Sequence, residues 1–255
     1  MSSLITSTIR CILDLNCFYN LSNVVDILFK TILDILFPPF CAGCGKFGVV
    51  ICLKCIERIE FNHLNTCLVC GGQSIKGFTH PSCATFYTPE RFISPFVYSD
   101  LVRKAILEGK FRGKTFYLYE TLADIAYYYL YEVGIAFGNE ALVIPVPLSH
   151  EKLSLRGFNQ SDVIAQVLAA RFGVPFVGNV LKKIKETRPQ SRLARGERFV
   201  NVSGVFQVSA LVHGKDVLLV DDVCTTGATF LSCCRALKEA GTRFVWCFSL
   251  ARAVN

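Results

Sequence analysis

The residues with the clearest capacity for chemistry lie in the stretch VLLVDDVCTTGATF, positions 217–230, where an apolar run ends in two acids. The apolar run predicts a buried strand, and the loop after it leads into a helix. The first N–H groups of a helix have no partner within the helix, and its dipole favours an anion there. The loop offers hydroxyl donors and small residues at this position, namely Thr225, Thr226, Gly227, Ala228 and Thr229. This pattern predicts a cradle for a phosphate monoester.

Asp221 and Asp222 would repel a phosphate and therefore need another partner in the site. Paired carboxylates suit the vicinal hydroxyls of a ribose, or a magnesium ion held through water. A ribose phosphate is therefore the ligand class that we expect here. The sequence has no G-x-x-x-x-G-K-[ST] and no G-x-G-x-x-G after a strand, so these two phosphate-binding motifs are excluded. The alternative is a capped helix after a buried strand, without a ligand.

A second candidate for chemistry is a cluster of cysteines. The chain has 13 cysteines, and seven of them lie between Cys41 and Cys83. They form four pairs with two intervening residues, one of which contains a histidine: Cys41/Cys44, Cys52/Cys55, Cys67/Cys70 and His80/Cys83. Two such turns supply the four tetrahedral ligands that structural Zn²⁺ prefers, and the odd, clustered set argues against a disulfide framework. We therefore expect two structural Zn²⁺ sites, formed either by neighbouring or by interleaved pairs.

The composition is that of a folded, basic protein in a reducing compartment. The chain has 255 residues, of which 52% are hydrophobic, so a sizeable core is expected and global disorder is excluded. The net charge of +7 suits phosphorylated or polyanionic ligands, although many ordinary proteins are equally basic. The cysteines outside the paired motifs are expected to be small, mostly buried side chains: Cys11, Cys17, Cys224, Cys233, Cys234 and Cys247.

Residues 21–40, LSNVVDILFKTILDILFPPF, predict an amphipathic helix that ends at Pro38. Asp26, Lys30 and Asp34 recur every four residues and share one helical face. An uninterrupted apolar stretch of about 20 residues, which a membrane span requires, is missing. We expect the helix to dock on the body of the protein, with membrane or partner binding as the alternative. The expected location is the cytoplasm, with peripheral attachment to the inner membrane as the alternative.

The rest of the chain alternates between expected strands and expected helices. The strands are expected at 91–100, 141–150, 215–223 and 242–252, and the helices at 101–114, 116–134, 159–173 and 227–241. Continuous apolar strands that alternate with helices predict an α/β fold with a mostly parallel sheet covered on both faces. Ligands in such sheets bind at the carboxyl ends of the strands. The segments 221–229 and 145–160 would both lie there.

The order of these motifs resembles a known family. LLVDDVCTTGAT resembles the phosphoribosyl pyrophosphate motif of type I phosphoribosyltransferases. LFPPFCAGCG, VYSDLVRKAILEGKFRGK, PVPLSHEKLSLRGFNQ and ETRPQSRLARGERFVNVSGVF resemble successive blocks of the ComF family of competence-protein-like phosphoribosyltransferases, in the same order. The resemblance covers residues 36–252, and His80 stands where the family usually has a cysteine.

The resemblance implies a type I phosphoribosyltransferase-like sheet with a small N-terminal double zinc ribbon. The expected parts are an amphipathic helical extension (1–37), the double zinc ribbon (38–90) and the transferase-like domain (91–255). Asp221 and Asp222 would be catalytic and hold the ribose hydroxyls. The 5′-phosphate would lie on the loop that also includes Val223 and Cys224 and runs to Thr229. Pyrophosphate, with Mg²⁺, would be bound by the loop after 142–146 through a set of polar side chains: Lys152, Arg156 and Asn159.

The resemblance also implies a flap that would close over the active site and exclude water. The flap would lie in ETRPQSRLARGERFVN, positions 186–201, with its functional residues at Gln190, Arg192, Arg195 and Arg198. The alternative for this segment is a charged surface loop.

Two functions of different classes are compatible with these features. One is transfer of a phosphoribosyl group to an unknown acceptor. The other is a factor that handles single-stranded DNA together with a DNA-uptake machinery, as the resemblance to competence proteins implies. The expected electrostatic footprint for DNA is the pair of basic segments 102–114 and 181–198, with Lys110, Arg112 and Lys114 as contact residues.

Overall fold

The computed structural model describes residues 38–111, 116–138, 140–184, 204–208 and 212–253. The expected N-terminal helix and the expected flap, including Gln190, Arg192, Arg195 and Arg198, lie outside the described residues, as do Arg112 and Lys114. The described residues confirm the predicted α/β class.

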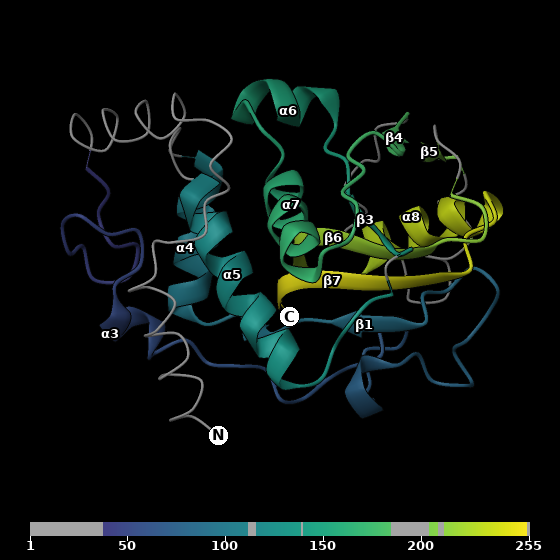
Figure 1. Ribbon diagram of the computed structural model, residues 1–255, viewed down its shortest axis with the longest axis horizontal. Coiled ribbons are helices and arrows are strands. Elements are labelled where there is room, and N and C mark those ends of the chain that lie inside the picture. The colour runs from purple at the N-terminus through teal and green to yellow at the C-terminus, as the bar shows by residue number, and fades with distance from the viewer. Residues whose placement is uncertain (1–37, 112–115, 139, 185–203, 209–211, 254–255) are drawn as a thin grey trace.

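A parallel sheet forms the centre of the molecule (Figure 1). Its strands are β1 (Arg91–Ile93), β7 (Phe244–Arg252), β6 (Asp216–Cys224) and β3 (Leu142–Pro145), in that spatial order. A further short strand, β2 (Phe96–Val97), pairs with the end of β7. Every one of these pairings is parallel, so the carboxyl ends of the strands lie at one edge of the sheet.

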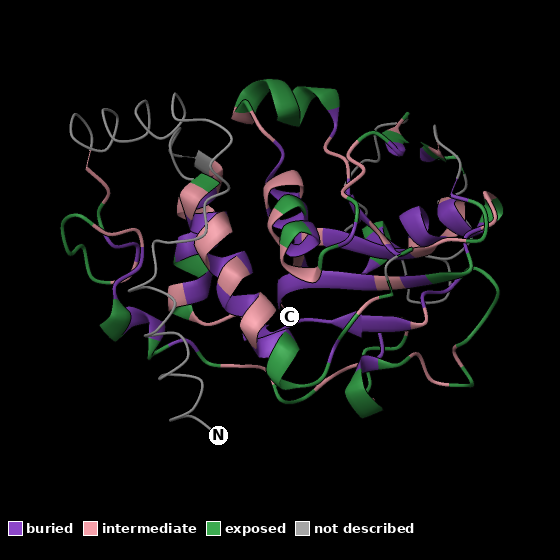
Figure 2. Cartoon of the chain, viewed as in Figure 1, coloured by how far each residue is buried: buried purple, intermediate pink, exposed green. Residues whose placement is uncertain are grey.

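The central strands are apolar on both faces because both faces are covered. Leu218 and Val220 of β6 contribute to one buried cluster, and Val217 and Leu219 contribute to the other. Figure 2 shows the described central strands mostly in the colour of buried residues. Alternate side chains of this continuous hydrophobic strand therefore point to opposite faces and pack into two different cores.

Helices lie on both faces of the sheet. Long helices pack on the face of Leu218, and they are α4 (Asp100–Phe111), α5 (Phe116–Glu132) and α7 (Gln160–Phe172). On the face of Leu219 lie α8 (Ala228–Glu239) and a small antiparallel pair, β4 (Leu181–Lys183) with β5 (Phe206–Val208). None of the helices within the described ranges is both long and apolar enough to cross a membrane.

Two expectations about local structure are wrong. The strand expected at 91–100 is split into β1 and β2 at Ser94-Pro95, where proline has no N–H to donate to a sheet. The stretch after β3, expected to be a loop, contains the exposed helix α6 (His150–Arg156). Ser149 caps α6 by accepting a hydrogen bond from the Lys152 N–H, and Gly157 ends it in the left-handed conformation.

The cysteine-rich segment contributes to both buried clusters. It contains the short helices α3 (Leu53–Ile56) and η1 (Ile75–Gly77). Ile51, Ile56 and Ile59 join the buried cluster of α4 and α5, whereas Leu68 joins the cluster of α8. The two halves of the segment therefore pack against residues on opposite faces of the sheet.

We predict that Gly109→Ala destabilises the protein although alanine favours helices. A Cβ at Gly109 of α4 would lie 2.5 Å from Cε2 and 2.8 Å from Cζ of Tyr119, whose side chain is fully buried. Overpacking of this kind costs about 1–3 kcal/mol, against a gain of about 1 kcal/mol in helix propensity. Urea unfolding should show a net loss of up to about 2 kcal/mol in the free energy of unfolding.

The matched control is Gly138→Ala, because a Cβ at Gly138 would meet no atom within 4 Å. Its free energy of unfolding should stay within about 0.5 kcal/mol of the wild-type value. Equal effects at the two glycines would contradict close α4–α5 packing at Tyr119.

Candidate functional site

Asp221 lies within β6, near its carboxyl end, where it is opposite Ser249 of β7. Its Oδ1 accepts hydrogen bonds from the Ser161 hydroxyl at 2.9 Å and from the Asp222 N–H at 2.8 Å. Ser161 belongs to the first turn of α7, so this contact joins the start of α7 to the end of β6. Because β6 continues to Cys224, both acids belong to the strand itself and are held by its pairing.

Asp222 is only 8% exposed and has a cationic partner. Its Oδ2 forms an ion pair with Lys110 Nζ at 2.7 Å, and its Oδ1 accepts a hydrogen bond from the Val223 N–H at 2.7 Å. Lys110 was expected on a DNA-binding surface. The structure instead places it in the candidate site, with a largely buried side chain.

The close packing of α4 on α5 sets the position of Lys110. Gly109, the residue before it, allows the helix backbone to approach the ring of Tyr119. The Tyr119 hydroxyl in turn donates a hydrogen bond to the Ile106 carbonyl at 2.8 Å, in the preceding turn of α4. Because Gly109 allows this close packing, Lys110 at the end of α4 can reach Asp222 on β6.

Burial, and after it the negative charge of Asp222, raise the pKa of the Asp221 carboxyl to about 7. The hydrogen bonds from Asp222 N–H and Ser161 and the charge of Lys110 act in the opposite direction and do not fully compensate. Near neutral pH the Asp221 side chain is therefore present both as the carboxylate, which accepts hydrogen bonds, and as the carboxylic acid, which can also donate one.

The loop after β6 combines an exposed polar rim with a buried glycine. Thr225, Thr226 and Thr229 are exposed, whereas Gly227 is buried at the N-cap of α8 with φ of 80°. Thr226 Oγ1 accepts a hydrogen bond from the Ala228 N–H at 3.4 Å. The next N–H groups of α8 belong to the turn that an α-helix cannot satisfy internally. The geometry fits the predicted phosphate cradle.

Cys224 does not supply a nucleophile to this loop. Its side chain is 2% exposed, and burial raises the pKa of its thiol to about 12. The thiolate is the nucleophilic form of cysteine, so a neutral buried thiol is inert. Cys224 instead belongs to the buried cluster of α8, as the sequence predicted.

The three residues expected to bind pyrophosphate lie in different surroundings. Lys152 is exposed on α6, and Arg156 at the end of α6 donates a hydrogen bond to Gln160 Oε1 at 3.1 Å. Asn159 is buried and caps α7 by accepting from the Ser161 N–H, while its amide group donates to Val146 O and Asp162 Oδ1. Asn159 thus fixes the start of α7 beside Asp221, and its two amide donors are occupied.

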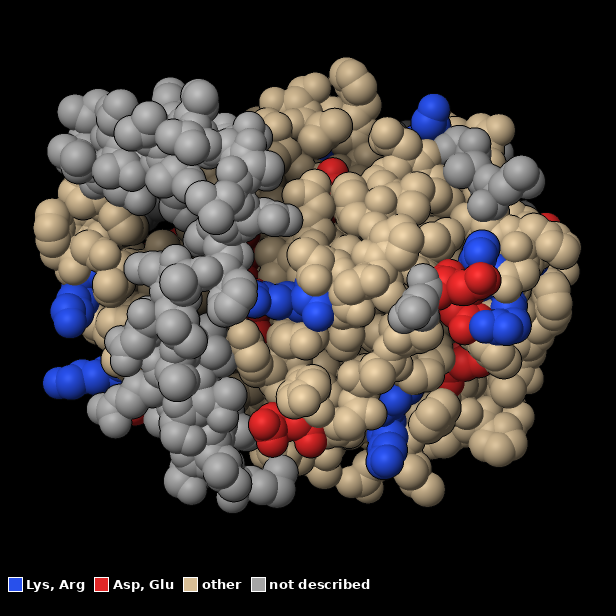
Figure 3. Space-filling model, in the orientation of Figure 1, with Lys and Arg blue, Asp and Glu red and all other residues tan. Residues whose placement is uncertain are grey.

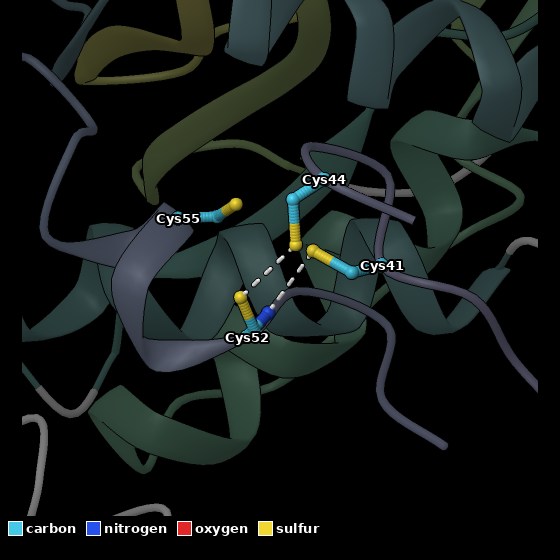
Figure 4. A group of neighbouring side chains, drawn as sticks. All are labelled: Cys41, Cys44, Cys52 and Cys55. Atoms are coloured by element: carbon cyan, nitrogen blue, oxygen red, sulfur yellow. Dashed lines mark hydrogen bonds between the residues drawn. The ribbon is translucent and has the colours of Figure 1, made fainter. Parts of the chain in front are cut away.

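The first cysteine cluster consists of Cys41, Cys44, Cys52 and Cys55, whose sulfur atoms all lie within 4.8 Å of one another. Figure 4 shows the four side chains directed toward one another. The Cys52 N–H donates to Cys41 Sγ at 3.3 Å, and Gly45 turns the chain after Cys44 with φ of 77°. Four thiols at this spacing fit tetrahedral structural zinc, and neighbouring pairs form the site.

The second cluster consists of Cys67, Cys70, His80 and Cys83, again within 4.8 Å of one another. His80 Nδ1 lies 3.3 Å from Cys70 Sγ, whereas its Nε2 lies 2.8 Å from the Gln73 carbonyl. A proton on Nε2 donates to that carbonyl and leaves Nδ1 free as a metal ligand. His80 therefore fits a zinc ligand set in place of a fourth cysteine.

Sequence reasoning missed two residues of the site, Lys110 and Ser161. Ser161 lies in the first turn of a helix that starts at the predicted ligand edge of the sheet, and this position could have identified it. Lys110 is 111 positions before Asp221 in the chain, so only the packing of α4 on α5 brings it to the acids.

We predict that Asp221→Asn removes a pH dependence of stability. Since the folded state raises the pKa of Asp221, it holds a proton that the unfolded chain, with a carboxyl pKa of about 3.9, has already lost. The free energy of unfolding of the wild type, relative to the variant, should therefore fall as the pH rises from 5 to about 8. Urea unfolding of both proteins at each pH measures this difference.

Asp216→Asn is the control, since Asp216 lies at the other end of β6 and pairs with Arg243 on the surface. Any pH dependence that the three proteins have in common cancels in the comparison. A difference between wild type and Asp221→Asn that stays constant from pH 5 to 8 would contradict the assignment.

Comparison with known proteins agrees with both parts of the site. The model of the phosphoribosyl transferase domain matches residues 159–253, and that of the double zinc ribbon domain matches residues 32–85. The first match begins at the cap of α7 and includes both acids and the loop 225–229 that is predicted to bind phosphate. The second includes all eight clustered ligand positions, from Cys41 to Cys83.

Several named proteins are similar to this chain. "Competence protein F" of Haemophilus influenzae is 34% identical over 114 residues, which are 44% of this chain and 50% of that protein. "DNA utilization protein YhgH" of Salmonella typhimurium is 29% identical over 210 residues, covering 77% of this chain and 88% of that protein. "Competence protein ComFC" of Bacillus subtilis is 24% identical over 203 residues, covering 75% and 79%. The match to the Haemophilus protein spans only half of its length. The motifs, the two domain matches and these relatives together support a ComF-family protein with a phosphoribosyltransferase-like domain and a double zinc ribbon.

Proposed function

We propose that this protein binds phosphoribosyl pyrophosphate with Mg²⁺ at the carboxyl end of β6 and transfers the phosphoribosyl group to an acceptor. One observation carries the proposal. Asp221 and the buried Asp222 lie shortly before an exposed, hydroxyl-rich loop at the start of the 12-residue helix α8. This order places acceptors for sugar hydroxyls next to donors for a phosphate.

The acids would receive the ribose hydroxyls, and the loop 225–229 would receive the 5′-phosphate through N–H and hydroxyl donors. Lys110 forms an ion pair with Asp222 and thereby balances its charge. Carboxylate oxygens are ligands that Mg²⁺ accepts, and Mg²⁺ bound with the substrate would neutralise charge on the pyrophosphate leaving group. Lys152 and Arg156 are the proposed pyrophosphate contacts, and the flap residues are proposed to close over them.

In the proposed transfer, the bond between the anomeric carbon and the pyrophosphate oxygen breaks, and pyrophosphate leaves with the electron pair. The acceptor nucleophile forms the new bond to that carbon and gives up its proton to the departing pyrophosphate. Positive charge develops on the ribose during this exchange. The carboxylates of Asp221 and Asp222 stabilise that charge because they are fixed by hydrogen bonds before the reaction starts.

Calorimetric titration of phosphoribosyl pyrophosphate with Mg²⁺ into the zinc-loaded full chain tests the proposal. We expect binding by the wild type and its loss in the double variant Asp221→Asn/Asp222→Asn, because the amides cannot offer the same charge to ribose and Mg²⁺. Asp216→Asn is the matched control, as the same substitution on the same strand, and should bind like the wild type. A double variant that binds as well as the wild type would contradict the proposed site.

A second candidate function rests on the names of the relatives, which include "DNA utilization protein" and "Competence protein". In this alternative the chain handles single-stranded DNA during DNA uptake and does not transfer a phosphoribosyl group. On the face drawn in Figure 3, the described basic side chains are interspersed with acidic ones and form no continuous patch. Lys182 on β4 is exposed, but Lys110 is paired with Asp222.

The same preparation separates the two candidates. Binding to a single-stranded oligonucleotide that weakens steeply with salt, without binding of phosphoribosyl pyrophosphate, would favour the second function. Binding of phosphoribosyl pyrophosphate without salt-sensitive DNA binding would favour the first.

A further inference from the structure

The turn of the second cysteine cluster lies directly against the proposed phosphate loop. Leu68, between the ligands Cys67 and Cys70, is 1% exposed. A Cβ at Gly227 would lie 2.9 Å from Leu68 Cδ1 and 3.3 Å from the Leu68 carbonyl oxygen. Glycine is therefore needed at position 227 both for its φ of 80° and because the metal-site turn occupies the adjacent space.

Leu68 also shares a buried cluster with the hydrophobic groups at the two ends of the loop. It belongs to the buried cluster that includes Cys224, which precedes the loop, and Phe230, which follows it. The ring of Phe230 packs against that of Phe92 in β1, with 5.9 Å between centroids. A displacement of Leu68 would open space beneath the loop on the side opposite its exposed threonines.

A polar contact joins the same two parts of the molecule. Arg252, at the end of β7, pairs in register with Cys224 of β6. Its Nη1 donates to Thr66 Oγ1 and, at 3.4 Å, to the carbonyl of the ligand residue Cys67. Its guanidinium group lies over the ring of Phe92, 5.4 Å from the centroid. Arg252 thus holds the start of the second cluster against the end of the strand pair that carries the phosphate loop.

The second cluster has little hydrophobic support of its own. Between positions 66 and 83, only Cys67, Leu68 and Gly77 are buried. A segment with so few buried apolar side chains depends on its metal ion for a defined conformation. The first cluster differs, because it packs with Ile51, Ile56 and Ile59 against the face of α4 and α5.

We propose that metal in the second cluster holds Leu68 and Arg252 in place as positioning residues for the phosphate loop, so that occupancy of this cluster sets the order of the loop and its affinity for phosphate. The first cluster, on the other face of the sheet, has no such effect. The part concerning affinity rests on the proposed function, whereas the part concerning loop order does not.

The first test compares the two clusters in the full chain without any phosphate ligand. Cys44→Ser and Cys70→Ser each remove an exposed cysteine that is the second ligand of a C-x-x-C turn. Elemental analysis should give about one zinc per chain for each variant, against about two for the wild type. Amide hydrogen exchange across residues 225–231 should accelerate in Cys70→Ser and stay near wild type in Cys44→Ser. Equal exchange in the two variants would overturn the proposal.

The second test keeps both ligand sets intact and measures binding. Leu68→Ala should retain two zinc ions and bind phosphoribosyl pyrophosphate about tenfold more weakly or worse, since truncation leaves a cavity under the loop. Leu53→Ala is the matched control, because Leu53 occupies the same position in the turn Cys52–Cys55 and is 39% exposed. Unchanged affinity and unchanged exchange at 225–231 in Leu68→Ala would overturn the proposal.

Two measurements keep the outcomes distinct. If Leu68→Ala does not fold, Arg252→Gln takes its place in this test. Its control is Arg243→Gln, since Arg243 lies next to the opposite end of β7. The Arg252 variant should then loosen the loop and the Arg243 variant should not. If the wild type does not bind phosphoribosyl pyrophosphate, the proposed function fails, but the exchange comparison of Cys70→Ser with Cys44→Ser still decides whether the second cluster orders the loop.

Discussion

Two adjacent acidic side chains near the end of β6, of which Asp222 is buried, impose the arrangement of the elements around them. Burying a charged side chain costs free energy unless the charge is paired or hydrogen-bonded. Asp222 is paired with a cation from the end of α4, and Asp221 is hydrogen-bonded to the first turn of α7. Both helices must therefore reach the carboxyl end of β6, and Gly109 and the cap residue Asn159 are the local features that allow them to do so.

The loop 225–229, which is proposed to bind phosphate, packs in contrast against residues on the other face of the sheet. There the turn of the second cysteine cluster, the aromatic pair Phe92–Phe230 and Arg252 lie beneath or beside it. The acids are thus supported from the face of α4 and α7, and the loop from the face of α8. The two cysteine clusters look equivalent in sequence but pack against opposite faces of the sheet. The first lies with α4 and α5, and the second lies with α8.

The sequence was sufficient for features that depend on neighbours along the chain. Periodicity and caps located α7 and α8, continuous apolar runs located β3, β6 and β7, and C-x-x-C spacing identified both ligand sets. Spacing alone left open whether neighbouring or interleaved pairs share a metal, because each turn is complete in itself. The helix α6 was missed because it is short and exposed and buries no apolar stripe that a periodicity could show.

Features that depend on packing between distant segments could not be predicted in this way. The ion pair of Lys110 with Asp222 and the contact of Leu68 with Gly227 each join residues more than 100 positions apart. In the sequence, Lys110 is one of several cations in a basic stretch, and Leu68 is an ordinary apolar residue between two ligands. The fold gives each of them a specific partner, and the sequence pattern contains no sign of that partner.

The most direct test of the ribose-phosphate site is a crystal structure of the zinc-loaded protein with ribose 5-phosphate. The account predicts that the phosphate lies on the N–H groups and hydroxyls of residues 225–229 and that the vicinal hydroxyls contact Asp221 and Asp222. A sugar phosphate bound elsewhere, or bound at the loop with its hydroxyls turned away from both acids, would contradict it.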